Sequence, residues 1–312
     1  MIFLMLPTGN KTTKFAAGFQ MKNIYCDISA TTPAAPEVAD LMHQISMDSF
    51  GNPSSIHRFG QKAKAAIEKA RRQISNALNC SPGEIYFTGC GSESNNLALQ
   101  GILKPDDHVI SSSYEHPAIL KTLDYLQAKG VKVSLIKPDR DGIIHPHLIE
   151  EKITDDTKLI SIMWVNNEVG TINPIEEIAR LCKETELIFH TDAVQAFGKL
   201  PIDLQSIPVQ LLSLSAHKLY GPKGVGVLFI RKGVTVHPLL HGGGQEKNLR
   251  PGTENIPGIA GFGLAAELSQ TQLESDSKSI RQHSQRFLSQ LSNNGIDFSQ
   301  NGTNTIPGVM NL

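Results

Sequence analysis

Short apolar runs alternate with amphipathic stretches from residue 84 onward. Apolar runs bounded by turn-forming residues are typical of buried strands, and the stretches between them have the spacing of helices. This alternation predicts βαβ units and a mostly parallel, buried sheet. The expected strands are Ile85–Thr88, His108–Ser112, Val131–Ile136, Leu159–Val165, Leu187–Thr191, Val209–Leu214 and Val225–Ile230.

The helical pattern is clearest between strands. Helices are expected at Ala118–Ala128 and Pro174–Lys183, and upstream over residues 63–78, where apolar side chains share one face. Ile24–Asp27 has the composition of a short strand. After Gly258 the pattern becomes helical, which we interpret as a helix that leads into a second, smaller domain.

Composition narrows the class of protein. The 312 residues carry 29 Lys and Arg against 30 Asp and Glu, a net charge of −1, so no nucleic-acid or acidic-membrane partner is indicated. A hydrophobic content of 40% with 19% charged residues is typical of a globular chain. The four cysteines form no CxxC pair, which argues against a zinc site or a disulfide framework and for a reducing, cytoplasmic setting.

The two ends of the chain lead to a prediction of domain boundaries. The apolar run Met1–Leu6 is too short to span a membrane, and basic residues follow it rather than precede it, unlike a signal peptide. We expect residues 1–20 to be a disordered extension, with Met21 as the natural start. Residues 21–275 are expected to form a large domain, and residues 276–312 the start of a small, incomplete one.

Lys218 lies just beyond the buried strand Val209–Leu214. A lone lysine usually stays in water. Here Ser215 and His217 can donate hydrogen bonds to an anion, and desolvation at a strand end would lower the pKa of the amine and free it for Schiff-base chemistry. The working hypothesis is that Lys218 holds an aldehyde cofactor, pyridoxal phosphate.

A candidate phosphate site follows the first predicted strand. Thr88–Asn96 runs from a strand through glycines into a helix that Ser92 is expected to cap. Backbone N–H groups and a hydroxyl at a helix N-terminus can hold a phosphate. No Gly-Lys-Ser/Thr follows, so this is not a Walker A loop. Seen alone, the stretch also fits an ordinary strand–turn–helix.

Three more polar stretches follow predicted strands. His116 can stack on a ring and move protons, or simply begin a helix. The amides of Asn166–Asn167 can bind a phenolic oxygen or a carboxylate, or form a turn. Asp192 can pair with a protonated pyridine nitrogen, or cap a helix. Because ligands bind at the carboxyl ends of parallel strands, these stretches are expected to lie together.

Two other motifs carry no such meaning. Gly261–Ala266 fits the dinucleotide pattern GxGxxA, but no strand precedes it, so close helix packing is the better interpretation. His241–Gly244 is similar to an esterase oxyanion loop, but the chain contains no GxSxG elbow.

Taken in order, these stretches resemble the cysteine desulfurases, which belong to the class V aminotransferase branch of the fold-type I pyridoxal phosphate enzymes. The resemblance runs from about Ile24 to the end of the chain. The stretches that carry it are Ala30–Thr32, Gly51–His57, Thr88–Asn96, Glu115–Ala118, Asn166–Gly170, Asp192–Gln195, Ser215–Gly226, His241–Glu246 and Arg250–Asn255. The implied fold is a large α/β domain, with a mostly parallel seven-stranded sheet flanked by helices, plus a small C-terminal domain.

The resemblance implies roles around the cofactor ring. Lys218 would form the Schiff base, and Asp192 would pair with the pyridinium. His116 would stack on the ring and shuttle protons. Asn167 and Gln195 would hold the phenolic oxygen of the ring, with Asn167 also near the substrate carboxylate.

The resemblance also implies how the phosphate is held and which partners bind. Gly91, Ser92, Ser215 and His217 would bind the phosphate. Thr253 would reach the phosphate held by the other subunit, which implies a homodimer with shared active sites. The substrate would be L-cysteine, and an iron–sulfur scaffold or another acceptor protein would receive the sulfur.

The chain departs from the family pattern in several places, one of which is Cys26 in place of an aliphatic residue. Ser92 stands where the family usually has threonine, which keeps the hydroxyl. Cys90 replaces a glycine; it is expected to be a small buried thiol rather than one whose pKa is lowered by a helix N-terminus. The sulfur-accepting cysteine of the family and an arginine that clamps the substrate carboxylate lie beyond Leu312, and none of the four cysteines matches that cysteine's position.

We therefore expect a C-terminally truncated cysteine desulfurase that binds its cofactor but releases little or no sulfur. Two alternatives stay open. The chain is a lyase or aminotransferase of the same branch, which needs no loop cysteine, or it is an inactive fragment that at most binds the cofactor or dimerises.

Overall fold

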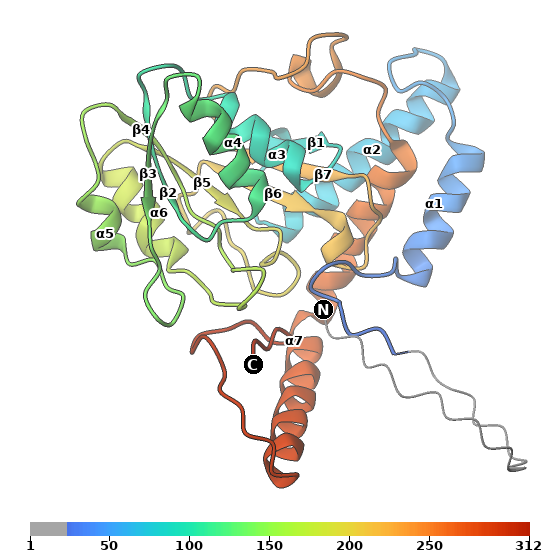
Figure 1. Cartoon of the computed structure of the whole chain (residues 1–312). Helices are drawn as coiled ribbons and strands as arrows, with labels where there is room; N and C mark the ends of the chain where they lie inside the picture. The colour runs from blue at the N-terminus through green and yellow to red at the C-terminus, as the bar shows by residue number, and fades with distance from the viewer. Residues whose placement is uncertain (1–23) are drawn as a thin grey trace, which may run out of the picture.

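A seven-stranded sheet between two layers of helices forms the body of the molecule (Figure 1). The computed structural model describes residues 24–312, so the predictions for residues 1–20 and for a start at Met21 lie outside the described residues. The strands are β1 (Ile85–Thr88), β2 (His108–Ser112), β3 (Lys132–Ile136), β4 (Thr157–Ser161), β5 (Ile188–Asp192), β6 (Leu211–Ser215) and β7 (Gly226–Ile230).

The order of strands across the sheet is β1-β7-β6-β5-β4-β2-β3. β7 pairs antiparallel with both β1 and β6, and every other pair is parallel. The prediction of an α/β fold with a mostly parallel sheet is confirmed, and the sheet is mixed because β7 alone runs against its neighbours. The carboxyl ends of the other six strands therefore lie at one edge.

Seven α-helices flank the sheet in the described chain. They are α1 (Pro36–Asp48), α2 (Arg58–Ala77), α3 (Gly91–Gln100), α4 (Pro117–Gln127), α5 (Pro146–Glu150), α6 (Ile175–Glu184) and α7 (Ile256–Asn293). Neighbouring residues of a strand enter opposite cores: Val109 of β2 packs with α3 and α4, while Ile110 packs with the helices of the other face. Except at the edge strand β3, where Lys132 and Leu135 are exposed, both faces of the sheet are buried, which explains why most of the strands are apolar runs without alternation.

Two of the strand predictions need correction. Ile24–Asp27 forms no strand, since the segment lies at the surface, has no strand partner within the described chain and leaves Ile24 81% exposed. β4 ends at Ser161, earlier than predicted, because the chain beyond it bends into a turn closed by an antiparallel bridge between Val165 and Ile172. Both segments have strand-like composition but lack a continuous ladder partner.

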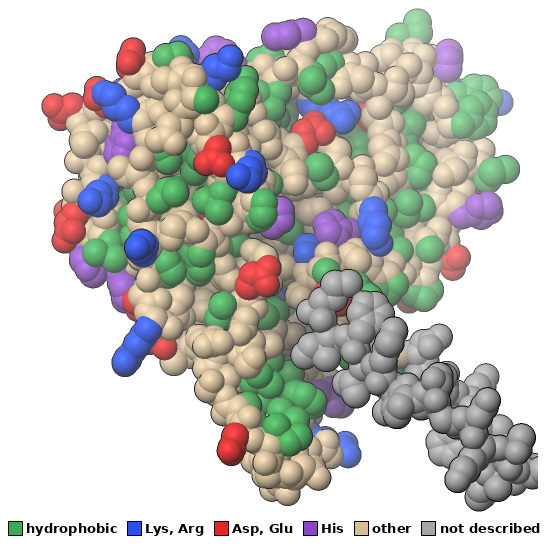
Figure 2. All heavy atoms as spheres, in the orientation of Figure 1, with side chains coloured by type: hydrophobic (Ala, Val, Ile, Leu, Met, Phe, Trp, Pro, Cys, Tyr) green, Lys and Arg blue, Asp and Glu red, His purple; other side chains and the backbone are tan. Residues whose placement is uncertain are grey.

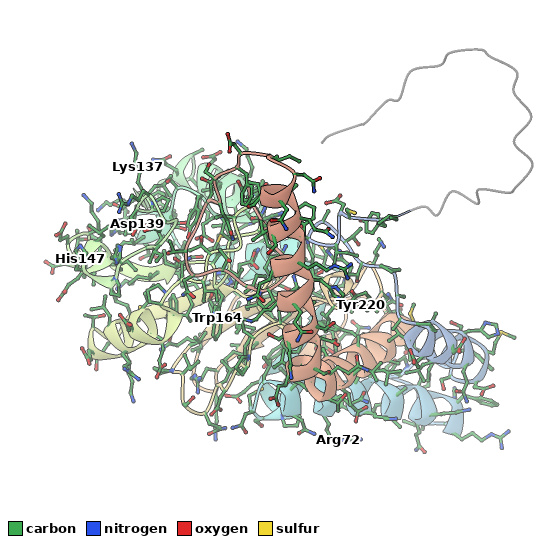
Figure 3. All side chains as sticks on the ribbon, turned by 90° about the horizontal axis from the view of Figure 1, so that it is seen from below. Arg72, Lys137, Asp139, His147, Trp164 and Tyr220 are labelled. Carbon is green, nitrogen blue, oxygen red and sulfur yellow. The ribbon has the colours of Figure 1, made fainter. Side chains whose placement is uncertain are left out.

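Helix α7 is 38 residues long. Its first half packs on α1 and α2 (Figure 1). A Cβ on Gly263 would lie 2.5 Å from the Cα of Ala70, so the GxGxxA stretch serves close helix packing, as predicted. Its second half projects from the body and crosses the middle of the molecule when seen from below (Figure 3). Among residues 24–312, no helix combines the length and the apolar character that a membrane span requires.

The C-terminal segment returns from α7 to the sheet edge. Ile306 is buried, and its N–H donates to the carbonyl oxygen of Gly170 at 2.9 Å. The N–H of Ile172 donates to the backbone carbonyl oxygen of Asn304 at 2.8 Å. Apolar side chains gather on the surface of the projecting part of the molecule (Figure 2). In the second half of α7, Ile280 and Phe287 are exposed. The division into domains at residue 275 stays a prediction.

Candidate functional site

A cavity of about 500 Å³ lies at the edge of the sheet where the carboxyl ends of the strands meet. Nine of the ten predicted site residues line it: Gly91, Ser92, His116, Asn167, Asp192, Gln195, Ser215, His217 and Lys218. They follow or end β1, β2, β4, β5 and β6, as expected for parallel strands. The tenth, Thr253, lies apart, in a smaller recess that Arg250 and Asn255 also line.

Lys218 ends a short 3-10 turn (Ala216–Lys218) directly after β6. Its Nζ donates hydrogen bonds to the backbone carbonyl of Ser29 and to that of Ala30, the latter at 2.8 Å. Partial burial lowers the pKa of this amine, and the negative charge of Asp192 opposes that effect. The lowered pKa increases the share of free amine available for Schiff-base formation.

Residues 29–32, the N-terminal segment of the site, are hydrogen-bonded to residues 217–220, the loop that carries Lys218. Thr32 N–H donates to the carbonyl of His217 at 2.9 Å, and Tyr220 N–H donates to the hydroxyl of Thr32 at 2.8 Å. The hydroxyl of Thr31 is hydrogen-bonded to Nδ1 of His217 at 3.1 Å. The cavity is thus closed on one side by a part of the chain far away in sequence.

Asp192 is the last residue of β5 and is 6% exposed. Its Oδ1 accepts from Val194 N–H at 3.0 Å, and its Oδ2 accepts from Nδ2 of Asn95 at 2.7 Å. Burial raises the pKa of this carboxyl, while those two hydrogen bonds and the charges of His116 and Lys218 oppose the rise. Within residues 24–312 no cation forms an ion pair with Asp192, so the cavity wall holds a buried carboxylate open to a cationic ligand.

The N-terminus of α3 opens into the cavity. The helix begins at Gly91 and its N-cap is Cys90, whose Sγ accepts from Glu93 N–H at 3.4 Å. The prediction that Ser92 caps the helix is therefore wrong, since Ser92 lies in the first turn. A Cβ on Gly91 would lie 3.0 Å from Cγ2 of Val194, which keeps this wall of the cavity tight.

The exposure of Cys90 differs from the prediction for this residue. It was expected to be a small buried thiol, but it is exposed and lines the cavity. The reason is its N-cap position, because a cap residue lies outside the packed part of the helix. This thiol belongs to the candidate site.

His116 is the N-cap of α4 and lines the cavity. Its Nδ1 accepts from Ala118 N–H at 3.1 Å and so caps the helix. In the neutral imidazole the proton then sits on Nε2, which is the nitrogen left for a ligand. The interpretations as a helix-start residue and as a site residue are both compatible with this position.

The two asparagines after β4 have different surroundings. Asn166 is buried and shapes the turn, since its Oδ1 accepts from the N–H groups of Glu168 and Val169, both at 2.9 Å. Asn167 lines the cavity, and its Nδ2 donates to the Glu168 carboxylate at 3.0 Å. Only Asn167 is therefore placed to contact a ligand in the cavity.

Gln195 is held on both sides of its amide. Its Nε2 donates to the carbonyl of Ser29 at 2.9 Å, and its Oε1 accepts from Nζ of Lys199 at 2.5 Å. Ser29 thus accepts from both Gln195 and Lys218, which joins these two side chains through one carbonyl oxygen.

Sequence reasoning missed two contributors to the site. Asn95, which contacts Asp192, lies four residues after Gly91, and this one-turn spacing on a helix was the available signal. The carbonyl groups of Ser29 and Ala30 act through the backbone, for which side-chain patterns give no signal.

Comparison with known proteins decides the family. The sequence profile of the family "Aminotransferase class-V" matches residues 24–312. The chain belongs to this family. It is 42% identical over 297 residues to "Cysteine desulfurase IscS" of Dictyoglomus turgidum, an alignment covering 93% of this chain and 75% of that relative.

Solved structures of family members have the same fold. A "NifS-like protein" superposes with a TM-score of 0.88 at 39% identity, over 92% of this chain and 80% of that one. "SspA in complex with cysteine" superposes with a TM-score of 0.76 at 44% identity, over 78% of this chain and 72% of that one. By family the chain is a cysteine desulfurase, and it is shorter than these relatives.

Proposed function

We propose that the cavity binds pyridoxal phosphate and that Lys218 is the residue that joins its aldehyde. The observation that carries the proposal is a pair of groups on the walls of one cavity: the partly buried amine of Lys218 and the buried carboxylate of Asp192, which forms no ion pair within residues 24–312. A pyridinium nitrogen is the kind of cation that such a carboxylate requires.

The other residues of the cavity fit the remaining parts of this cofactor. The α3 N-terminus at Gly91 and Ser92 would hold the phosphate together with Ser215 and His217. His116 would lie against the ring. This arrangement supports the assignment because a dianion is favoured at a helix N-terminus.

Two amides would hold the phenolic oxygen of the ring. Asn167 and Gln195 line the cavity from β4 and β5, and each presents an amide that can donate. Asn167 would also contact the substrate carboxylate. When bound, the cofactor supplies an electron sink for the substrate.

The side chains of the chain itself would handle charge and protons. Asp192 would be kept ionised by the ring nitrogen, which reverses the effect of its burial. The amine of Lys218, whose pKa is already lowered, would accept and return a proton in the cavity. Nε2 of His116 would donate or accept the second proton, since Nδ1 is occupied by the cap of α4.

We propose that the substrate is L-cysteine, which is converted to L-alanine while the sulfur passes to an enzyme persulfide for iron–sulfur cluster assembly. The family and the solved relative described with cysteine support this. We assign the persulfide to none of the four cysteines, because none matches the position of the sulfur-accepting cysteine of the family. In addition, burial raises the pKa of both Cys80 and Cys182 to about 12, so these two are thiols at neutral pH.

The proposal extends to assembly and location. Thr253 would reach the phosphate held by a second copy in a homodimer, which is compatible with its position outside the cavity of its own subunit. An iron–sulfur scaffold or another acceptor protein would take the sulfur, and the setting would be cytoplasmic.

Product analysis tests the reaction. The chain is loaded with pyridoxal phosphate and incubated with L-cysteine, selenocysteine and keto acids in turn. Binding of cysteine with formation of alanine supports the proposal. Fast conversion of another substrate would make it a lyase or an aminotransferase, and a loaded chain that converts nothing and binds no cysteine would be an inactive cofactor-binding fragment.

A further inference from the structure

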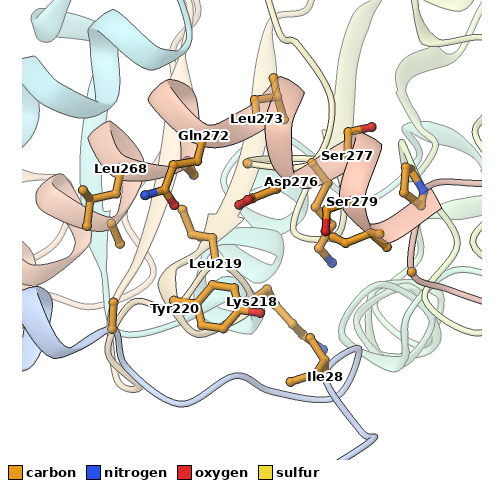
Figure 4. A pocket seen from close by; sticks show the side chains of 18 of the residues that line it. Ile28, Lys218, Leu219, Tyr220, Leu268, Gln272, Leu273, Asp276, Ser277 and Ser279 are labelled. Atoms are coloured by element: carbon orange, nitrogen blue, oxygen red, sulfur yellow. The ribbon is translucent and has the colours of Figure 1, made fainter. Parts of the chain in front are cut away.

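A second cavity, of about 450 Å³, lies beside the first (Figure 4). Ser29 and Lys218 line both cavities and so form the wall between them. The second cavity lies between α7, the loop after β6 and the C-terminal segment. One part of its wall is apolar and is formed by Leu219, Leu268, Leu273, Ile280 and Val309. The rest carries polar side chains, among them Ser269, Gln272 and Asp276.

Lys199 lines this second cavity. Its Nζ donates to Oε1 of Gln195, and within the described chain it forms no ion pair with a carboxylate. The charged residues that share the cavity are Glu37 of α1, Asp276 of α7 and Lys218. Lys199 is thus an amine with one amide partner and with a second lysine close by.

The surroundings of Lys199 favour the neutral amine. Burial, and then the positive charge of Lys218, lower its pKa to about 8. At pH 7 roughly one amine in ten is then neutral, whereas an ordinary lysine with a pKa of about 10.4 has fewer than about one in a thousand. Desolvation and a neighbouring cation are the two conditions that make a lysine nucleophilic.

We propose that Lys199 is a second reactive amine of this chain and that the second cavity admits small apolar aldehydes and ketones to it. Nζ attacks the carbonyl carbon, a C=N bond forms, and the carbonyl oxygen leaves as water with the two protons of the neutral amine. The step is reversible and involves no oxidation or reduction. Apolar carbonyl compounds fit because the leucine, isoleucine and valine side chains in the wall of the cavity offer them contact area.

Modification of Lys199 reaches the first cavity through Gln195. The imine nitrogen carries no hydrogen, so Oε1 of Gln195 loses its donor. Gln195 then keeps only its bond to Ser29, the residue that also accepts from Lys218. A carbonyl compound in the second cavity would therefore loosen the amide that faces the first. This inference does not depend on the reaction proposed above.

The test is reductive labelling of the full chain with butanal and cyanoborohydride between pH 6 and pH 10, with the modification of each lysine measured by peptide mass spectrometry. Lys121 is the internal control, because its side chain is 80% exposed on α4. The expected result at pH 7 is labelling of Lys199 at least about tenfold faster than Lys121, because its neutral fraction is more than about a hundredfold larger while a less basic amine attacks more slowly. The rate midpoint is expected near pH 8. Labelling no faster than Lys121, or a midpoint near that of an ordinary lysine, would overturn the proposal.

Two further arms separate this site from the cofactor site. Loading with pyridoxal phosphate is expected to protect Lys218 and leave Lys199 reactive; protection of Lys199 as well would contradict a separate cavity. Leu273→Trp, at a partly exposed position of α7, is expected to slow labelling of Lys199 and leave Lys121 unchanged. An unchanged rate at Lys199 in the folded variant would exclude the cavity as the route.

Discussion

Nδ2 of Asn95 donates a 2.7 Å hydrogen bond to Oδ2 of Asp192. The bond joins α3, whose N-terminus is the proposed phosphate site, to the end of β5, which carries the proposed partner of the ring nitrogen. Both residues are buried, and the Oδ1 of Asn95 has no partner within the described chain. The amide is thus oriented by the carboxylate alone, and one hydrogen bond fixes the two proposed halves of the cofactor site relative to each other.

Asn95→Ala is expected to weaken the binding of pyridoxal phosphate by about 10- to 100-fold, since a hydrogen bond to a buried charged group contributes about 1.5–3 kcal/mol. The loss also raises the pKa of Asp192 further, because this bond favours the charged carboxylate. Titration of the absorbance with cofactor measures the affinity. Asn96→Ala is the matched control, as Nδ2 of Asn96 donates to the backbone of Ser92. Equal affinities for the two variants would contradict the role given to Asn95.

Glu115, next to His116, is a buried carboxyl group between β2 and β4. Its Oε1 accepts from the hydroxyl of Ser112 at 2.6 Å and from Met163 N–H at 2.9 Å, while Oε2 has no partner in the described chain. Burial raises its pKa to about 8. The native state therefore binds a proton that the unfolded state, with a carboxyl pKa of about 4.3, has released.

This difference predicts a pH trend. Between about pH 4 and pH 8 the native state holds more protons at Glu115 than the unfolded state, so its contribution to the free energy of unfolding falls as pH rises. Glu115→Gln keeps both acceptor bonds and has no charge to bury. Urea unfolding at pH 5 and pH 8 should show the variant gaining on the parent chain at the higher pH. A constant difference, like that expected for Glu150→Gln at an exposed position, would mean that Glu115 is not buried as a neutral acid.

Arg71 and Glu246 form a buried ion pair that ties α2 to the loop before α7. Two hydrogen bonds of 2.7 and 3.0 Å join them, and the Glu246 side chain is 4% exposed. Arg71→Met is expected to cost about 3–5 kcal/mol of unfolding free energy, because it leaves a buried carboxylate unpaired. Lys121→Met, which breaks the exposed pair with Asp124, should cost less than about 1 kcal/mol. Chemical denaturation compares the two, and similar losses would refute the distinction.

Gly226 of β7 lies under the turn that carries Cys90. A Cβ at this position would lie 2.5 Å from the backbone carbon of Cys90, so Gly226→Ala must displace the start of α3. The expected result is a loss of both stability and phosphate affinity, measured by thermal melting with and without inorganic phosphate. At Gly83 the nearest atom would lie at 3.7 Å, so Gly83→Ala should change neither quantity appreciably. A Gly226→Ala chain that melts and binds like the parent would contradict the proposed phosphate site.

The sheet could be predicted because its strands are buried on both faces and read as apolar runs. His116, Asp192, Ser215 and Lys218 could be placed together because parallel strands bring their carboxyl ends to one edge. Contacts between distant segments had no such signal. The bond from Lys218 to Ser29 spans 189 positions, and it depends on a backbone carbonyl. Sequence pattern predicts Ser92 as the cap of α3, because hydroxyls are the usual helix caps, whereas the chain uses the thiol of Cys90. The roles of the site residues themselves stay predictions.

The proposed cofactor site depends most on the amine of Lys218. The direct measurement is to load the chain with pyridoxal phosphate, reduce it with borohydride and locate the modified lysine by peptide mass spectrometry, with Lys223→Ala as the control that keeps Lys218. The account predicts a phosphopyridoxyl group on Lys218 in the parent and control chains, and none at this position in Lys218→Ala. A chain that takes up no cofactor, or that carries it on another lysine while Lys218 stays unmodified, would contradict the account.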